Sequence, residues 1–135
     1  MPIIKTSELT GYALDWAVAK CHGKGLDLED PSDPWITVDG IADQPLHSYT
    51  PSTDWSQGGP IIEREVISVY PHRIVGTSES GSSVDMLNGW KAHGRTSAYW
   101  ITPKTYLGPT PLIAPMRCYV ASCLGDEVEI PEGLL

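Results

Sequence analysis

Residues 108–125 read GPTPLIAPMRCYVASCLG and hold the clearest helix signal in the chain. Thr110 can cap a helix, and Pro111 suits the first helical position, where no backbone N–H is needed. Apolar residues then recur at helical spacing up to Gly125, which can end the helix. They are Leu112, Ile113, Met116, Tyr119, Val120 and Cys123. Pro115 lies just beyond the first turn of this predicted helix, so we expect it to cost a backbone hydrogen bond and to bend the helix.

A second amphipathic helix is predicted over residues 7–22. Thr6 or Ser7 can cap its start and Gly23 can end it. Its apolar stripe follows the helical period. The residues of this stripe and those beside it are Leu9, Ala13, Leu14, Trp16, Ala17, Val18, Lys20 and Cys21. The two strongest helix signals therefore lie near opposite ends of the chain.

The residues between these helices favour short strands and turns, in keeping with 13 glycines and 12 prolines among 135 residues. Residues 35–38 predict a strand before the turn Asp39-Gly40, and residues 61–75 predict a β-rich region. Further strands are expected within residues 86–101, notably Ser97–Ile101. The chain is thus interpreted as one α+β domain, residues 1–135, with a mainly antiparallel, short-stranded sheet.

The remaining segments are predicted to be irregular. Residues 24–34 are acidic and contain two prolines, and residues 41–60 contain three prolines with little apolar periodicity. Residues 77–83, TSESGSS, are expected to form an exposed hairpin tip or a flexible loop. Residues 126–135 are interpreted as a short acidic tail.

Charge and composition exclude several classes of function. Nine basic residues against 17 acidic ones give a net charge of −8, which argues against binding to long nucleic acid. No stretch is long and apolar enough to span a membrane, and the N-terminus lacks a signal peptide, which favours a cytosolic protein. Three cysteines without C-x-x-C spacing and four scattered histidines predict neither a metal site nor a cofactor.

Residues 48–65, SYTPSTDWSQGGPIIERE, are the richest in groups that could bind a ligand. Backbone N–H groups at Gly58 and Gly59 can converge on an anion, and Pro60 is expected to keep Gly59 extended. Trp55 offers a stacking face and Arg64 a planar fork for carboxylate or phosphate. The ligand-binding residues predicted in this segment are Tyr49, Ser52, Thr53, Asp54, Trp55, Gln57, Gly58, Gly59, Glu63 and Arg64.

The Gly108–Pro111 segment offers a second candidate half of the same site. It leads to the start of the C-terminal helix, where free N–H groups attract negative charge. Thr110 and Arg117 are the ligand-binding residues predicted here. If the two Gly-Pro segments face each other, they enclose a cleft for a compact ligand with a ring and polar edges. The structural alternative is that residues 48–65 form a capped loop over the sheet edge and that Thr110 merely caps its helix.

Three blocks of the chain resemble the phage NinX-like family. They are KTSELTG with LDWAVAK in residues 5–20, YTPSTDWSQGGPIIERE at residues 49–65, and GPTPLIA with MRCYVAS in residues 108–122. Pro115 departs from the alanine expected at its position. The resemblance implies a bacteriophage or prophage accessory protein that acts in the host cytoplasm, and it implies no particular reaction.

Three functions follow as hypotheses. The leading one is a non-enzymatic binder that captures a small polar or nucleotide-derived ligand, such as a host defence signal. The second is an acidic inhibitor that binds a host protein through its aromatic residues. The third is a nucleotide-acting hydrolase using Asp54 and Glu63 as an acid–base pair, although no catalytic residue is assigned. Self-association into a homo-oligomer is left open.

Overall fold

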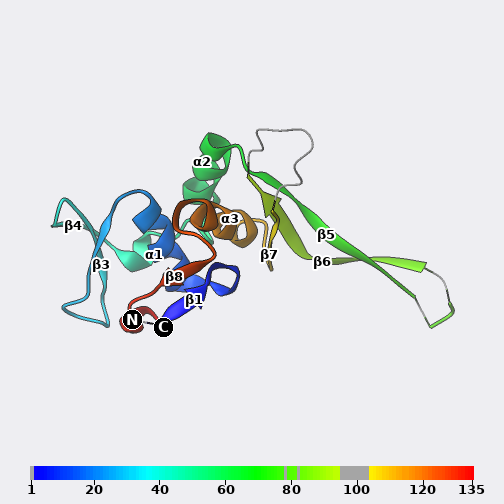
Figure 1. Ribbon diagram of the computed structural model, residues 1–135, viewed down its shortest axis with the longest axis horizontal. Coiled ribbons are helices and arrows are strands. Elements are labelled where there is room, and N and C mark those ends of the chain that lie inside the picture. The colour runs from blue at the N-terminus through cyan, green and yellow to red at the C-terminus, as the bar shows by residue number, and fades with distance from the viewer. Residues whose placement is uncertain (1, 78, 82, 95–103) are drawn as a thin grey trace.

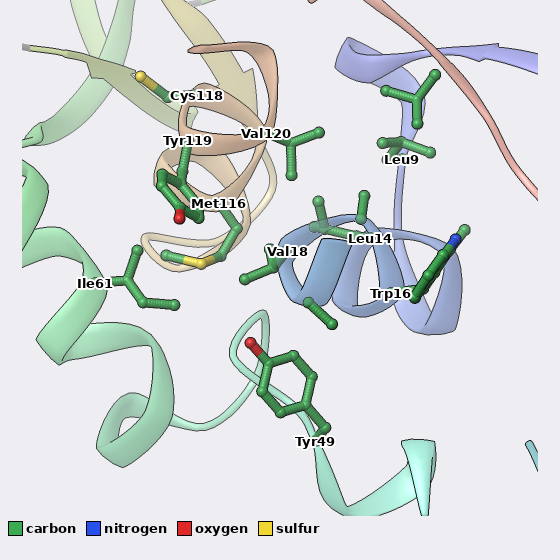
Figure 2. Packing of buried hydrophobic residues seen from close by; sticks show 14 of the residues in the cluster. Leu9, Leu14, Trp16, Val18, Tyr49, Ile61, Met116, Cys118, Tyr119 and Val120 are labelled. Carbon is green, nitrogen blue, oxygen red and sulfur yellow. The ribbon is translucent and has the colours of Figure 1, made fainter. Parts of the chain in front are cut away.

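Two helices lie at the centre of the computed structural model, which describes residues 2–77, 79–81, 83–94 and 104–135. Helix α1 spans Gly11–Cys21 and helix α3 spans Ile113–Leu124. Figure 2 shows how apolar side chains of both helices meet in one core. The centre of that core consists of Leu14, Val18, Met116 and Val120, which are fully buried. The predicted α+β class, with one helix near each end of the chain, is confirmed.

Helix α1 begins later than the sequence predicts. Residues Thr6–Glu8 form a separate 3₁₀ helix, and the residue that precedes α1 is Thr10. The hydroxyl of Thr6 does not cap α1, because it donates a 2.6 Å hydrogen bond to the carbonyl of Gly125. The expected cap is therefore wrong, and Thr6 instead connects the N-terminal segment to the end of α3.

Helix α3 also begins later than predicted, with consequences for Pro115. The Thr110 hydroxyl accepts a 3.0 Å hydrogen bond from the Ile113 N–H, but the helix itself starts at Ile113. Pro115 is then the third helical residue. The N–H groups on either side of it donate to carbonyls four residues back, Ala114 to Thr110 at 3.3 Å and Met116 to Leu112 at 3.1 Å. Pro115 has no N–H to make the bond between these two, so the expected loss of one backbone hydrogen bond stands, although the proline lies within the first turn of the helix as it is observed.

The strands form three small antiparallel sheets (Figure 1). The first pairs β1 (Ile3–Lys5) with β8 (Glu127–Glu129); the second orders β2 (Gly25–Asp27), β3 (Trp35–Val38) and β4 (Ile41–Pro45); the third orders β5 (Ser68–Thr77), β6 (Ser83–His93) and β7 (Tyr106–Gly108). Two predicted irregular segments are thus corrected, since residues 25–27 and 41–45 are strands.

The C-terminal residues are not a solvated tail. Strand β8 pairs with β1, and its Val128 lies in the core together with Ile130 and Leu134. Pairing joins the two ends of the chain, with Ile4 opposite Val128. The acidic residues between these apolar positions face solvent, which explains why composition alone suggested a tail.

The predicted strand at residues 35–38 and its turn at Asp39-Gly40 are confirmed, whereas the strand that follows this turn was not predicted. Strands β3 and β4 are joined by Asp39 and Gly40, both with positive φ angles, as a two-residue hairpin turn requires. Strands β5 and β6 pair as far as Thr77 opposite Ser83, so these two strands form a hairpin. The two strands form a long arm that extends away from the helices (Figure 1). The predicted strand Ser97–Ile101 lies outside the described residues.

Helix α2, Trp55–Glu65, replaces a predicted loop and the start of a predicted strand. Asp54 caps it, and Ile61 packs into the core at 5% exposure. The glycines at 58 and 59 and Pro60 lie inside the helix, so Pro60 does not hold Gly59 extended. The helix ends at Glu65, and the next residue, Val66, adopts a left-handed conformation with φ of 53°.

Candidate functional site

The polar side chains at the start of α2 hydrogen-bond to one another. The Asp54 carboxylate accepts hydrogen bonds from the Ser56 N–H at 2.9 Å and from the Gln57 amide at 3.1 Å. The Gln57 side chain in turn accepts from the Thr50 N–H at 2.9 Å. Hydrogen bonding to Ser56 lowers the pKa of the Asp54 carboxyl. These contacts cap and anchor a helix without any ligand, so the segment is not the capped loop that the structural alternative expected.

The two glycines predicted to bind an anion have different surroundings. The Gly58 N–H donates to the Asp54 carbonyl at 2.9 Å, so it belongs to the helix start. A Cβ atom at Gly58 would lie 2.3 Å from the Pro51 carbonyl oxygen, whereas one at Gly59 would meet nothing within 4 Å. Gly58 therefore permits close packing of α2. An exposed anion cradle built from both N–H groups does not form.

The other predicted ligand-binding residues of this segment lie in different surroundings, some in the core and some in solvent. Tyr49 is buried in the core, and Trp55 is 55% exposed at the first position of α2. Thr53 and Glu63 face solvent. Arg64 donates to Glu65 at 3.3 Å and to the Tyr119 hydroxyl at 3.4 Å. A ligand-binding role for this face of α2 stays a prediction.

Ser52 contacts a buried acid, Asp15. Its N–H donates a 2.9 Å hydrogen bond to the carboxylate of Asp15, which lies in the middle of α1 and is 2% exposed. Burial raises the pKa of Asp15 to about 6, although the hydrogen bonds from Ser52 oppose this shift. The contact joins α1 to the segment before α2.

This buried carboxyl predicts a pH-dependent stability. A folded-state pKa above the ordinary value means that the stabilising contribution of Asp15 is present at low pH and is lost as pH rises through about 6. We expect the free energy of unfolding, relative to Asp15→Asn, to fall by about 2 kcal/mol between about pH 4.5 and pH 7. Urea unfolding of both proteins across this range measures the difference, and a constant difference would contradict the prediction.

A large open pocket lies against another side of α3. Its volume is about 820 Å³, within the usual size of small-molecule sites. Its walls come from the N-terminal segment, β6, β7 with its flanking residues, α3 and the start of β8. The lining residues are Lys5, Ser7, Asn88, Gly89, Lys104, Thr105, Tyr106, Leu107, Gly108, Pro109, Arg117, Asp126 and Glu127. We call this cavity the β7–α3 pocket.

Arg117 joins the walls of the β7–α3 pocket. Its Nε donates to the Leu9 carbonyl and its guanidinium Nη1 to the Leu107 carbonyl, each at 2.9 Å. These bonds use two of the five N–H donors of a guanidinium. Within the described part of the chain, no carboxylate forms an ion pair with Arg117, and the side chain is 8% exposed. Burial lowers the pKa of Arg117 from its usual value. The arginine therefore contributes positive charge to the wall of the pocket, and these two bonds leave it N–H donors to spare.

The rim of the pocket carries three more charged or aromatic groups. The Asp126 carboxylate accepts hydrogen bonds from the Lys104 ammonium and, at 3.1 Å, from the Tyr106 hydroxyl. The hydrogen bond from Lys104 is the main reason why the pKa of Asp126 is lowered. The Lys104 ammonium lies 5.6 Å from the centre of the Tyr106 ring. The lining thus contains three cationic side chains, Lys5, Lys104 and Arg117. It contains two anionic ones, Asp126 and Glu127, although acidic residues outnumber basic ones in the whole chain.

The structure brings only part of the predicted site to this pocket. Arg117 and the Gly108–Pro109 segment line it, whereas Thr110 caps α3 and the α2 residues lie elsewhere. Sequence reasoning missed Lys5, Lys104 and Tyr106. They come from separate stretches of sequence, and only the pairing of the chain ends and the position of β7 bring them together.

The described residues form neither a metal site nor a membrane-spanning helix. No three His, Cys, Asp or Glu side chains converge there to hold a metal ion. No helix in the same part of the chain is long and apolar enough to cross a membrane.

The fold and the pocket define a class: a small α+β protein whose two core helices support a positively lined cavity. Comparison with protein families identifies the chain more closely, because the family described as Bacteriophage P22, NinX, matches residues 5–123. The chain belongs to this family, as the three sequence blocks predicted, and it is a phage accessory protein. Among curated proteins, no sequence matches it.

Proposed function

We propose that this phage protein is a non-enzymatic binder that captures a small polar or nucleotide-derived ligand in the β7–α3 pocket. The single observation that carries the proposal is Arg117, a buried arginine with spare N–H donors on the wall of a cavity of about 820 Å³. A phosphate or carboxylate suits these donors, because guanidinium and anionic oxygens form strong charge-assisted hydrogen bonds.

The remaining lining fits the same class of ligand. Lys5, Lys104 and Arg117 outnumber Asp126 and Glu127 in the lining, so the pocket has a small local excess of positive charge on a chain of net charge −8, although Lys104 is paired with Asp126. The Tyr106 ring offers a surface for a base or another flat group. Sequestration of a nucleotide-like host defence signal would use these features, and it needs no catalytic group.

The first experiment is mass spectrometry of small molecules released from the purified, denatured protein. Calorimetry with nucleotides, cyclic nucleotides and inorganic phosphate then measures affinity and shows whether any ligand is altered. We expect Lys104→Gln to weaken binding roughly tenfold, since a hydrogen bond to a charged group contributes about 1.5–3 kcal/mol. Lys20→Gln, at an exposed position of α1, is the matched control and should leave affinity unchanged.

Three outcomes would change the proposal. Loss of binding in Trp55→Ala or Arg64→Ala, with Lys104→Gln unaffected, would place the ligand on the face of α2 instead. Conversion of a nucleotide to a product would favour the hydrolase. If a folded protein binds none of these compounds but purifies with one host protein, and charge reversal on its acidic surface abolishes the contact, the inhibitor hypothesis replaces the binder.

A further inference from the structure

The paired ends of the chain place two opposite charges on one wall of the β7–α3 pocket. Strands β1 and β8 lie side by side (Figure 1), and their register puts Lys5 directly opposite Glu127. Both residues line the pocket. Within the described part of the chain, neither the Lys5 ammonium nor the Glu127 carboxylate forms an ion pair. This wall therefore holds one cation and one anion in neighbouring positions, and both are available to a ligand.

Buried contacts fix the position of this charge pair. Thr6, which follows Lys5, is fully buried, and its N–H donates a 2.8 Å hydrogen bond to the Asp126 carbonyl. The Thr6 hydroxyl donates a 2.6 Å hydrogen bond to the Gly125 carbonyl. These two bonds hold the end of β1 against the start of β8. The spacing of Lys5 and Glu127 is therefore set by the fold and not by a loop.

Asp126, the acid beside Glu127, already has hydrogen-bond partners. Its carboxylate accepts hydrogen bonds from the Lys104 ammonium and, at 3.1 Å, from the Tyr106 hydroxyl. The Tyr106 side chain is partly exposed and also lines the pocket. Glu127 is therefore the carboxylate of this wall whose acceptors are free, and an aromatic side chain reaches the residue before it.

We infer that the β7–α3 pocket selects a ribonucleotide, with the Glu127 carboxylate accepting hydrogen bonds from the ribose hydroxyls and Lys5 binding the phosphate. This inference rests on the proposed function and names the class of its ligand. A carboxylate that accepts from a ribose hydroxyl is an established means of recognising this sugar. The order Tyr106, Glu127, Lys5 along the wall matches the order base, sugar, phosphate in a nucleotide.

An anion without a sugar uses only part of this wall. Inorganic phosphate can pair with Lys5, but its charge then lies near the unpaired Glu127 carboxylate, and like charges repel. A hydroxyl group next to the phosphate satisfies Glu127 without adding negative charge. In a nucleotide, the donors nearest the 5′-phosphate are the ribose hydroxyls, and a 2′-deoxynucleotide has one fewer of them. The pair Lys5 and Glu127 should therefore distinguish the two sugars.

The test is calorimetry of the folded chain with the ribonucleoside 5′-monophosphates of the common bases and their 2′-deoxy counterparts. We expect a ribonucleotide to bind roughly tenfold more tightly than its deoxy form, because it makes one more hydrogen bond to a charged group. Glu127→Ala should bring the ratio of the two affinities close to one. Lys5→Gln should weaken both forms by a similar factor and keep the ratio.

Glu129→Ala is the matched control, because Glu129 is exposed on the same strand, lies opposite Ile3 and does not line the pocket. It should leave both affinities and their ratio unchanged. Equal binding of the two sugars by the wild type, or a ratio that survives Glu127→Ala, overturns this inference and leaves the proposed function standing. A bound ligand that contains no ribose phosphate has the same meaning. A folded chain that binds no small molecule overturns both.

Discussion

Gly58→Ala is expected to lower the free energy of unfolding by about 3–4 kcal/mol, because overpacking against backbone cannot be relieved by a side-chain movement. The added Cβ would lie 2.3 Å from the Pro51 carbonyl oxygen and 2.7 Å from Leu112 Cδ2. Moving the Pro51 carbonyl would also disturb the adjacent Ser52 N–H, which is hydrogen-bonded to Asp15. Relief of the contact therefore costs a second interaction.

Gly59→Ala is the matched control, one residue further along the same helix. A Cβ there meets nothing within 4 Å, and alanine is a better helix former than glycine. We expect this variant to gain about 0.5–1 kcal/mol of stability. Urea unfolding of both variants measures the difference, and effects of the same sign and size would show that α2 does not pack at Gly58 as described.

The same two glycines explain why the sequence did not predict helix α2. Gly-Gly-Pro disfavours a helix by local propensity, and residues 41–60 lack apolar periodicity. Packing of Gly58 against Pro51 and Leu112, with Ile61 in the core, outweighs that preference. Helix propensity accounts only for the local cost of placing Gly-Gly-Pro in a helix. The contacts that compensate for this cost come from residues outside the helix.

Elements with complete local signals were predicted well. The β3–β4 turn needs two residues that accept positive φ, and Asp39-Gly40 supplies them. The stripes of α1 and α3 follow from spacing alone, although the ends of both helices were misplaced. The β1–β8 pair has no local signal, since Ile3 lies opposite Glu129 at the other end of the chain. The β7–α3 pocket depends on that pairing, so only Arg117 and its neighbouring Gly108–Pro109 segment could be found from the sequence.

Arg117 and Arg64 were both predicted as partners for an anion, and the structure gives them different surroundings. Arg117 is buried and holds the carbonyls of Leu9 and Leu107, thereby connecting α3 to the N-terminal segment and to β7. Arg64 is largely exposed; it pairs with the adjacent Glu65 and makes one long hydrogen bond, of 3.4 Å, to the Tyr119 hydroxyl. A structural contribution is therefore expected from one arginine and not from the other.

Arg117→Met should lower the free energy of unfolding by about 3–5 kcal/mol, because two hydrogen bonds to a charged group are lost and the Leu9 carbonyl is left buried without a donor. Arg64→Met, the control with the same change in chemistry, should alter stability by less than about 0.5 kcal/mol, as is usual for an exposed ion pair. Chemical unfolding at neutral pH compares the two variants. Equal effects would mean that Arg117 does not hold the pocket walls together. A folded Arg117→Met protein that still binds its ligand at full affinity would separate the structural role of this arginine from the anion-binding role proposed for it.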